Sequence, residues 1–431
     1  MPDRLASFVD AGICPALDSA HTEDLMKQFA LLVSVASLFL YGIIAAQAQT
    51  APRYKFDPDW PKPLPNNWKL GGVTGLAVDK DDNVWVLNRP NDLRDLELQA
   101  EIGIAACCTR PPTMIHIDKN GTVIGSFDAP EGHGMDVDSQ GFVYIGSDTV
   151  RKYDPKTGKE VAAIVRADPS PGGNRDAAPA PRVPGRGSAG PVGTVPQQPG
   201  GRGRGNADPA AQAAQAAALA AWQAKYPPTS PMIVGQIEEI RMDEPAGEIY
   251  VADAAFGGRV MVFDFKTLAF KRGWGAYGHK LSEISTNPAD REYKPGGPMP
   301  KEFRGHLTLN FSNDGLVYAA DRNANRIHVT DKQGNFKKEF ILAPTTGGGG
   351  STGGVAFSTD RQQRYLFISD LVNNHIWFLN REDGKVVGQM GSMGQNGGQW
   401  FGLHMIAVDS KGNIYTGEVF NGERVQRFVS N

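Results

Sequence analysis

Cysteine and histidine are scarce in this sequence, and neither sign of charge dominates it. The 431 residues include 3 cysteines and 8 histidines, and the formal net charge is −3. Without a basic excess, the composition does not favour a nucleic-acid partner, and we expect none. Without a Cys-x-x-Cys pair or a partner cysteine, a zinc site built from thiolates is disfavoured.

The one long apolar stretch lies near the start of the chain. Met26 and Lys27 give a short positive start, residues 29–46 are almost wholly apolar, and Ala46-Gln47-Ala48 is a small-residue cleavage site. We therefore interpret residues 1–48 as a signal-peptide region whose true start is Met26. The alternative is a membrane anchor. A cleaved signal predicts a periplasmic or secreted protein with no membrane span.

Two adjacent cysteines, Cys107 and Cys108, remain after the predicted cleavage site. In an oxidising compartment such a pair can form a vicinal disulfide. The alternative is two buried thiols in a loop, and the sequence leaves both open.

A repeated strand pattern organises the rest of the chain and is clearest in residues 306–341. Apolar and polar residues alternate there in short bursts, with the period of two that is typical of half-buried strands. The clusters Asn313-Asp314-Gly315 and Gln333-Gly334-Asn335 separate the bursts and favour tight turns. The stretch therefore predicts four antiparallel strands joined by short turns.

The same unit recurs along the chain and predicts an all-β fold, a six-bladed β-propeller. Four-stranded units at a spacing of about 40–50 residues are typical of propeller blades, which must stack to bury both faces. The last copy has only three strands, so we expect a strand near residues 54–57 to supply the fourth and remove an open edge. The other copies start at Gly75, His133, Ile237, Gly353 and His404.

Residues 166–232 interrupt the pattern. They are rich in Pro, Gly, Ala and Arg and lack aliphatic periodicity, which predicts a disordered, low-complexity insertion between blades 2 and 3. A short helix is expected at residues 210–225, and we expect the insertion to be dispensable for folding. The remaining ranges are 53–165 for blades 1 and 2 with the closing strand, and 233–431 for blades 3 to 6.

Three histidines occupy one repeat position in alternate blades. His133, His306 and His404 open blades 2, 4 and 6. Three imidazoles around one axis with an open fourth position form the layout of a catalytic zinc. Arg89 and Arg322 end the second strands of blades 1 and 4 at the same opening, where a guanidinium can grip a carboxylate. The alternatives are structural histidines and surface arginines.

The repeat resembles the NHL repeat, most clearly in YAADRNANRIHVTDKQGNF, which starts at Tyr318. Together with the histidines and arginines, residues 70–429 apart from the insertion resemble the catalytic propeller of peptidyl-α-hydroxyglycine α-amidating lyase, or peptidylamidoglycolate lyase. That resemblance implies cleavage of a peptidyl-α-hydroxyglycine into a peptide amide and glyoxylate. The implied site residues are His133, His306 and His404 for zinc, Arg89 and Arg322 for catalysis, and the main-chain carbonyls of Leu76 and Met135 for a structural calcium.

Some positions depart from the family pattern. A tyrosine of the family, proposed as a base in a blade-3 loop, is matched here by Ala255, and its calcium-binding aspartate by Met405. His306 lies nine residues before its turn glycine, whereas His133 and His404 lie eight before theirs. Since a one-residue slip turns a strand side chain away, His306 needs a bulge or a longer turn. Glu239, near the start of blade 3, is the candidate base.

Two functions therefore remain open. The first is an exported, zinc-dependent carbon–nitrogen lyase acting on a small-molecule or peptide substrate. The second is a non-catalytic NHL propeller that binds a peptide, a glycan or a protein partner. The three histidines favour the first function, and Ala255 favours the second.

Overall fold

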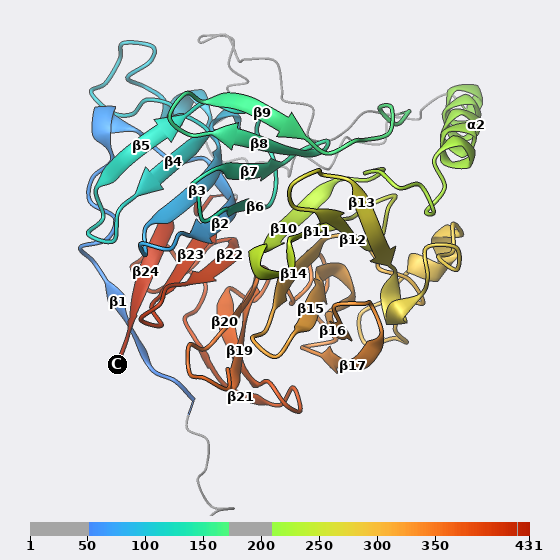
Figure 1. Ribbon diagram of the computed structural model, residues 1–431. Helices are drawn as coiled ribbons and strands as arrows, with labels where there is room; N and C mark the ends of the chain where they lie inside the picture. Colours follow the sequence, from blue (N-terminus) through green and yellow to red (C-terminus); the bar gives the residue numbers. More distant parts are fainter. Residues whose placement is uncertain (1–50, 172–208, 420) are drawn as a thin grey trace, which may run out of the picture. The chain divides into compact units, whose positions relative to one another are not determined.

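The computed structural model describes residues 51–171, 209–419 and 421–431. The predicted signal region, 1–48, and the middle of the insertion, 172–208, lie outside the described residues. Within residues 51–431, six four-stranded antiparallel sheets surround a common centre (Figure 1), so the predicted six-bladed β-propeller is confirmed. No helix in the described ranges is long and apolar enough to cross a membrane.

Each of the first three blades is a sheet whose strands follow one another in sequence order. Short turns join neighbouring strands, as the alternating pattern predicted. Blade 1 contains β2 (Gly72–Val78), β3 (Val84–Arg89), β4 (Met114–Ile117) and β5 (Val123–Phe127). Blade 2 contains β6 (Met135–Val137), β7 (Val143–Gly146), β8 (Val150–Asp154) and β9 (Lys159–Ala163). Blade 3 contains β10 (Ile237–Asp243), β11 (Glu248–Asp253), β12 (Arg259–Asp264) and β13 (Phe270–Trp274).

The last blade is completed from the other end of the chain. β1 (Tyr54–Asp57) pairs antiparallel with β24 (Val425–Ser430), with Tyr54 opposite Ser430, so it supplies the outer fourth strand of blade 6. Blade 4 contains β14 (Leu307–Phe311), β15 (Leu316–Asp321), β16 (Arg326–Asp331) and β17 (Phe336–Ile341). Blade 5 contains β18 (Val355–Phe357), β19 (Tyr365–Asp370), β20 (His375–Asn380) and β21 (Val386–Met390). Blade 6 contains β22 (Leu403–Val408), β23 (Ile414–Glu418), β24 (Val425–Ser430) and β1 (Tyr54–Asp57).

The hydrophobic core is divided among the six interfaces between neighbouring blades. One cluster contains Tyr250 of blade 3 and Leu309 of blade 4, and each of the other five likewise joins two adjacent blades. The innermost strands contact one another in a closed circle, from β2 through β6, β10, β14, β18 and β22 back to β2. Stacking in a ring buries both faces of every blade, which no blade achieves alone.

Buried ion pairs repeat inside the blades. Asp253 ends β11 and lies 2.9 Å from Arg259 at the start of β12, and Asp321 and Arg326 form the same pair at 3.1 Å in blade 4. All four side chains are fully buried. Removing one member of such a pair strands a charge and costs about 3–5 kcal/mol. Arg259 and Arg326 therefore stabilise the blades. Arg322, which follows Asp321 directly, is not part of this ion pair.

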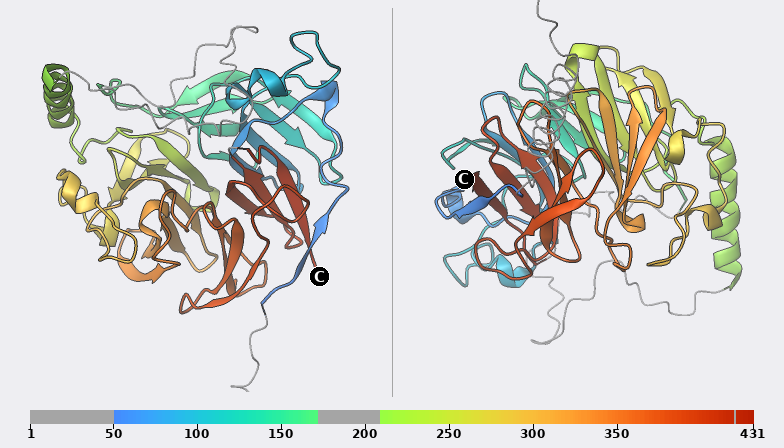
Figure 2. Two further views of the ribbon diagram at one scale, coloured as in Figure 1. Left: turned by 180° about the vertical axis from the view of Figure 1, so that it is seen from behind. Right: turned by 90° about the horizontal axis from the view of Figure 1, so that it is seen from below.

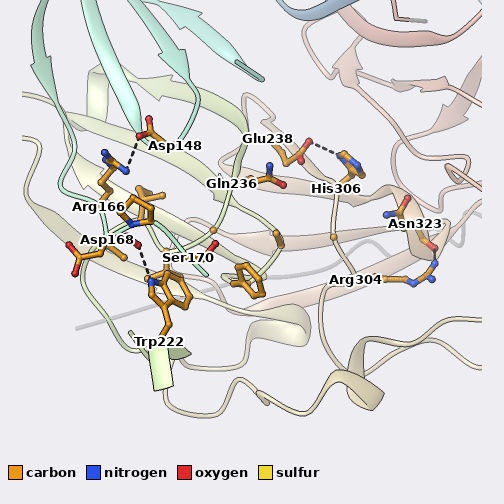
Figure 3. A pocket seen from close by; sticks show the side chains of 18 residues that line it. Asp148, Arg166, Asp168, Ser170, Trp222, Gln236, Glu238, Arg304, His306 and Asn323 are labelled. Atoms are coloured by element: carbon orange, nitrogen blue, oxygen red, sulfur yellow. Dashed lines mark hydrogen bonds and ion pairs between the residues drawn. The ribbon is translucent and has the colours of Figure 1, made fainter. Parts of the chain in front are cut away.

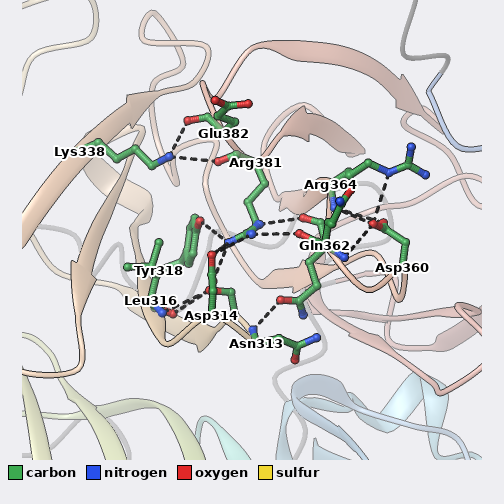
Figure 4. Close-up of polar contacts among 12 residues, drawn as sticks. Asn313, Asp314, Leu316, Tyr318, Lys338, Asp360, Gln362, Arg364, Arg381 and Glu382 are labelled. Atoms are coloured by element: carbon green, nitrogen blue, oxygen red, sulfur yellow. Dashed lines mark hydrogen bonds and ion pairs between the residues drawn. The ribbon is translucent and has the colours of Figure 1, made fainter. Parts of the chain in front are cut away.

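A polar contact ties blade 4 to blade 5 at the end of the blades away from the histidines. Arg381, just after β20, donates to Asp314 Oδ1 at 2.9 Å, to the hydroxyl of Tyr318 at 3.2 Å and to the carbonyl of Gln363 at 2.8 Å (Figure 4). Lys338 reaches back from β17 to the carbonyl of Glu382 at 2.5 Å. The two blades are thus fastened by side chains as well as by their apolar interface.

The C-terminal edge of the insertion is ordered and packed. Helix α2 (Pro209–Lys225) lies beside blade 3 (Figure 2), close to the predicted short helix, and Trp222 at its end is only 8% exposed. Arg259, which is fully buried, donates to the carbonyls of Ser230 at 3.1 Å and Met232 at 2.6 Å. The prediction that the whole of 166–232 is disordered is therefore wrong at this edge, whose carbonyls accept hydrogen bonds from a buried arginine.

Loops between the strands carry short 3-10 helices and, within the described residues, one disulfide. Cys107 and Cys108 are bonded to each other in the loop between β3 and β4, which decides between the two alternatives left open above. The 3-10 helices of the described residues are η1 (Pro65–Asn67), η2 (Pro90–Asp92), η3 (Asp95–Glu97), η4 (Glu244–Ala246), η5 (Ala276–Gly278), η6 (Pro288–Arg291) and η7 (Arg322–Ala324).

Candidate functional site

Side chains from four blades meet where the inner strands begin. His133 Nε2 lies 2.6 Å from His404 Nε2 and 3.3 Å from Glu238 Oε2. His306 Nδ1 lies 2.7 Å from the same carboxylate oxygen. The structure therefore brings together all three histidines chosen from the sequence, and adds Glu238. We call His133, Glu238, His306 and His404 the four-residue cluster.

Local backbone features aim these side chains at the centre. β-Bulges interrupt β10 between Ile237 and Glu239 and β22 between Leu403 and Met405, so Glu238 and His404 are the extra residues. A bulge re-aims one side chain without disturbing the rest of the strand. Gly134, after His133, has a φ of 71°, and a Cβ there would lie 2.6 Å from the Cα of Glu239. Only glycine allows this approach of blade 2 to blade 3.

His306 reaches the cluster by a different route. It lies just before β14, and its carbonyl accepts a hydrogen bond from the Arg322 amide at 3.0 Å. The pairing of β14 with β15 contains no bulge. The prediction that His306 needs a bulge or a longer turn is therefore wrong, and the bulge lies instead in blade 6, at His404.

Hydrogen bonds set the proton positions within the cluster. His133 Nδ1 lies 2.7 Å from the carbonyl oxygen of Glu238, which can only accept, so Nδ1 carries the proton. The Nε2 lone pair of His133 then points toward His404 Nε2. An Arg322 guanidinium nitrogen donates to His404 Nδ1 at 3.3 Å. His404 therefore carries its proton on Nε2 and donates it to His133.

Burial and neighbouring charges keep the histidines His133 and His404 neutral and Glu238 ionised. Burial lowers the pKa of His133 to about 4 and that of His404 well below its usual value, so both are neutral at pH 7. Burial alone would raise the pKa of Glu238, but His133, His306 and the Arg322 guanidinium lower it to about 2. Neutral imidazoles and an ionised carboxylate are the forms that bind metals.

Both predicted arginines lie next to the cluster. Arg322 is 7% exposed, and in the described structure its Nε is buried without a hydrogen-bond partner. Burial lowers its pKa to about 10, so it remains a cation at pH 7. Arg89 donates from Nε to the carbonyl of Gly132 at 3.2 Å, and its charge contributes to the lowered pKa of His133. A buried guanidinium with an unused donor is suited to holding an anion.

The donor set fits a divalent metal ion. His133, Glu238 and His306 each offer a ligand atom, and these atoms all lie within 4.8 Å of one another. His404 Nε2 adds a fourth donor at 2.6 Å from His133 Nε2. Tetrahedral zinc with nitrogen ligands at about 2.0–2.1 Å requires its donors to lie slightly further apart than this. A small outward movement of the two imidazoles would therefore accommodate an ion.

Glu239, the residue first considered as a base, faces away from the cluster. Its Oε1 accepts from Arg241 Nη1 at 2.8 Å, and burial raises its pKa to about 7. Glu238 takes the position near the histidines because of the bulge in β10. One signal in the sequence points to it: Glu238 lies nine residues before Gly247, the spacing of His306 from Gly315.

The carbonyl of Met135, one of the two expected to bind calcium, already has a cationic partner. Arg241 Nη1 donates to it at 3.2 Å and to the carbonyl of Ile240 at 2.9 Å. Leu76, the other expected ligand, lies within β2 opposite Val86. The guanidinium of Arg241 thus supplies positive charge beside one of the two carbonyls.

A cavity of about 350 Å³ opens beside the cluster. Glu238 and His306 form its inner end, and Figure 3 shows Trp222 and Asp168 at a distance from them along the wall. Ala255 also lines it. The site thus combines possible metal ligands with space for a small molecule or a chain end.

Comparisons with known proteins give a likeness in fold alone. No family model matches the chain, and no curated protein matches it. Among solved structures, virginiamycin B lyase from Staphylococcus aureus is 11% identical, with a TM-score of 0.41, over 84% of this chain and 86% of that chain. A catalytically inactive variant of that enzyme with quinupristin is 10% identical, with a TM-score of 0.41, over 88% of this chain and 87% of that chain.

Proposed function

We propose that this protein is a zinc-dependent lyase that cleaves the carbon–nitrogen bond of a peptidyl-α-hydroxyglycine, as the amidating lyases it resembles do. The observation that carries the proposal is the meeting of His133, Glu238, His306 and His404 beside the buried cation Arg322. The likeness of the repeat to NHL propellers supports the same assignment.

In this proposal the three imidazoles hold the metal, and Glu238 accepts a proton. Glu238 and His306 line the cavity, so the carboxylate lies on the side from which substrate arrives. A zinc ion bound here would polarise the substrate hydroxyl and make it more acidic. Glu238 would take the hydroxyl proton as the carbon–nitrogen bond breaks. The bond's electrons leave with nitrogen, which is protonated to the amide, and the hydroxyl carbon becomes the aldehyde of glyoxylate.

The arginines would orient the substrate. Arg322 keeps its charge in a buried position and has an unused Nε donor within the described structure, so it can bind the glycine carboxylate. Arg89, at the equivalent strand end of blade 1, is placed to share that anion. Fixing the carboxylate would hold the hydroxyl toward the metal and Glu238.

The signal peptide predicted from the sequence supports a role outside the cytoplasm. The signal-like region 1–48 predicts a periplasmic or secreted protein, and the Cys107–Cys108 disulfide fits an oxidising compartment. We accordingly propose a peptide or small-molecule substrate met outside the cytoplasm.

A specific observation favours a second function, a propeller that binds a peptide, glycan or protein without catalysis. Ala255 lines the cavity where the family places its tyrosine, so that hydroxyl is missing. The two functions differ in whether glyoxylate is released.

The test combines metal analysis with a glyoxylate assay on N-acetyl-phenylalanyl-α-hydroxyglycine. The purified protein should contain about one zinc per chain and release glyoxylate, and chelation should abolish release. Glu238→Gln should retain zinc and lose most of the activity. Loss of zinc in that variant would make Glu238 a ligand instead. Full zinc occupancy without glyoxylate would favour the binding function.

A further inference from the structure

The outer wall of the cavity is built by the two edges of the insertion. Trp222, at the end of α2, donates from its indole nitrogen to the carbonyl of Asp168 at 2.9 Å. It packs in a small cluster with Ala167 and Val234. Asp168 also accepts from Lys225 at 2.7 Å and from the Tyr226 hydroxyl at 2.5 Å. These contacts fasten residues on both sides of the insertion and hold Trp222 in place.

A second aromatic ring contacts the first at a tilt of 55°. Phe256, in the loop after β11, lies with its ring centroid 5.6 Å from that of Trp222, and both residues line the cavity. Phe256 is 38% exposed. Arg291 holds this loop by donating to the carbonyl of Ala255 at 2.6 Å. The backbone that carries Phe256 is therefore anchored beside the cavity.

Most charges in this outer part of the cavity neutralise one another. Arg166 lies 2.8 Å from Asp148, and Asp168 is paired with Lys225 (Figure 3 shows the first pair). The remaining lining there includes Pro169, Ile233 and Val234. Two aromatic rings, aliphatic side chains and paired charges favour an uncharged, flat apolar group over a charged one.

We propose that Trp222 and Phe256 form a subsite for an aromatic side chain on the residue that precedes the hydroxyglycine of the substrate. This rests on the proposed function, because it takes Glu238 and His306 as the place where the hydroxyglycine lies. The subsite and those two residues belong to one cavity, so one short peptide end can fill both. The substrates would be peptides ending in an aromatic residue followed by hydroxyglycine.

The test measures ligand binding separately from turnover. Calorimetry on the zinc-loaded full-length protein would compare N-acetyl-phenylalanyl-glycine with N-acetyl-alanyl-glycine, two carboxylate ligands that cannot react. We expect the phenylalanyl ligand to bind at least about tenfold more tightly. Phe256→Ala should remove most of this preference and leave the affinity for the alanyl ligand unchanged. Phe336→Ala, which removes a ring of similar exposure (37%) outside the cavity, is the matched control.

The outcomes separate this inference from the proposed function. Equal affinity for the two ligands, or a preference that survives Phe256→Ala, would overturn the subsite even if glyoxylate is released. A preference that Phe256→Ala removes would support the subsite even if N-acetyl-phenylalanyl-α-hydroxyglycine is not cleaved, in which case only the lyase activity is wrong. Absence of binding by both ligands would overturn the subsite.

Discussion

The Nε2 atoms of His133 and His404 lie 2.6 Å apart, although 271 positions separate the two residues in the chain. Both imidazoles are neutral, so one must donate to the other in this contact. Arg322 donates to His404 Nδ1, which keeps the His404 proton on Nε2, and His404 is therefore the donor. A metal ion bound to both Nε2 atoms would require that proton to move to His404 Nδ1. Arg322 could then no longer donate to Nδ1, and its guanidinium would have a further free donor.

The first prediction concerns the metal ligands. Replacing His133, His306 or His404 singly with alanine should weaken zinc binding by more than the roughly 10- to 100-fold that loss of a supporting contact costs. Competition with a chromophoric chelator measures the affinity. His375→Ala is the control, because His375 starts β20 and is outside the cluster. Unchanged affinity in His306→Ala would exclude the three-histidine site.

The second prediction is that zinc binding persists at unusually low pH for a histidine site. Protons compete with a metal only as the pH falls toward the ligand pKa, and burial lowers that of His133 to about 4. Affinity should therefore stay level down to about pH 6, where ordinary histidines of pKa about 6.5 already lose metal. Chelator competition at several pH values measures this. A decline that begins at pH 7 would contradict it.

The same shift predicts how the stability of the zinc-free protein depends on pH. Because the pKa of His133 is lower in the folded state, the unfolded chain binds more protons between its usual pKa of about 6.5 and about 4. This contribution to folding stability is therefore lost as the pH falls through that window. Denaturant unfolding of wild type and His133→Gln would measure it, and the variant should show the weaker pH dependence.

The third prediction separates anion binding from metal binding. Arg322→Ala should lower the affinity for N-acetyl-phenylalanyl-glycine by roughly 10- to 100-fold. This corresponds to the loss of a charged hydrogen bond worth about 1.5–3 kcal/mol. Zinc affinity should be retained or increased, because Arg322 no longer favours the wrong tautomer of His404. Arg381→Ala is the control, since that arginine ties blades 4 and 5 together away from the site. If Arg322→Ala lowered the affinities for zinc and for the ligand equally, Arg322 would only support the structure.

The fourth prediction concerns the insertion. Replacing residues 172–208 with a short Gly/Ser linker should leave the melting temperature nearly unchanged, because the packed edges remain. Replacing 166–232 should lower it strongly, because it removes Trp222, worth about 3–5 kcal/mol when buried, and the carbonyls that satisfy Arg259. Thermal unfolding followed by circular dichroism measures both. Equal melting temperatures would mean that these contacts contribute little.

The blades and much of the site follow from sequence periodicity. Alternation and turn clusters locate strands because they reflect local geometry, and the shared repeat position of His133, His306 and His404 follows from the same pattern. Glu238 was harder to find, because a bulge shifts the facing of a strand by one residue and depends on the neighbouring blade. Trp222 was missed because its partner Ala167 is distant in sequence and its surroundings are low in complexity.

Completion of blade 6 by β1 has a consequence for how the chain is made. Tyr54 and its partner Ser430 are 376 positions apart, so Ser430 is translated long after Tyr54. Until then the apolar faces of blades 1 and 5 have no covering blade, so a growing chain exposes two aggregation-prone apolar surfaces during synthesis. Folding must then wait for this long-range pairing, which makes it slow and nearly all-or-none. Newly made chains should therefore depend on chaperones until Ser430 is released.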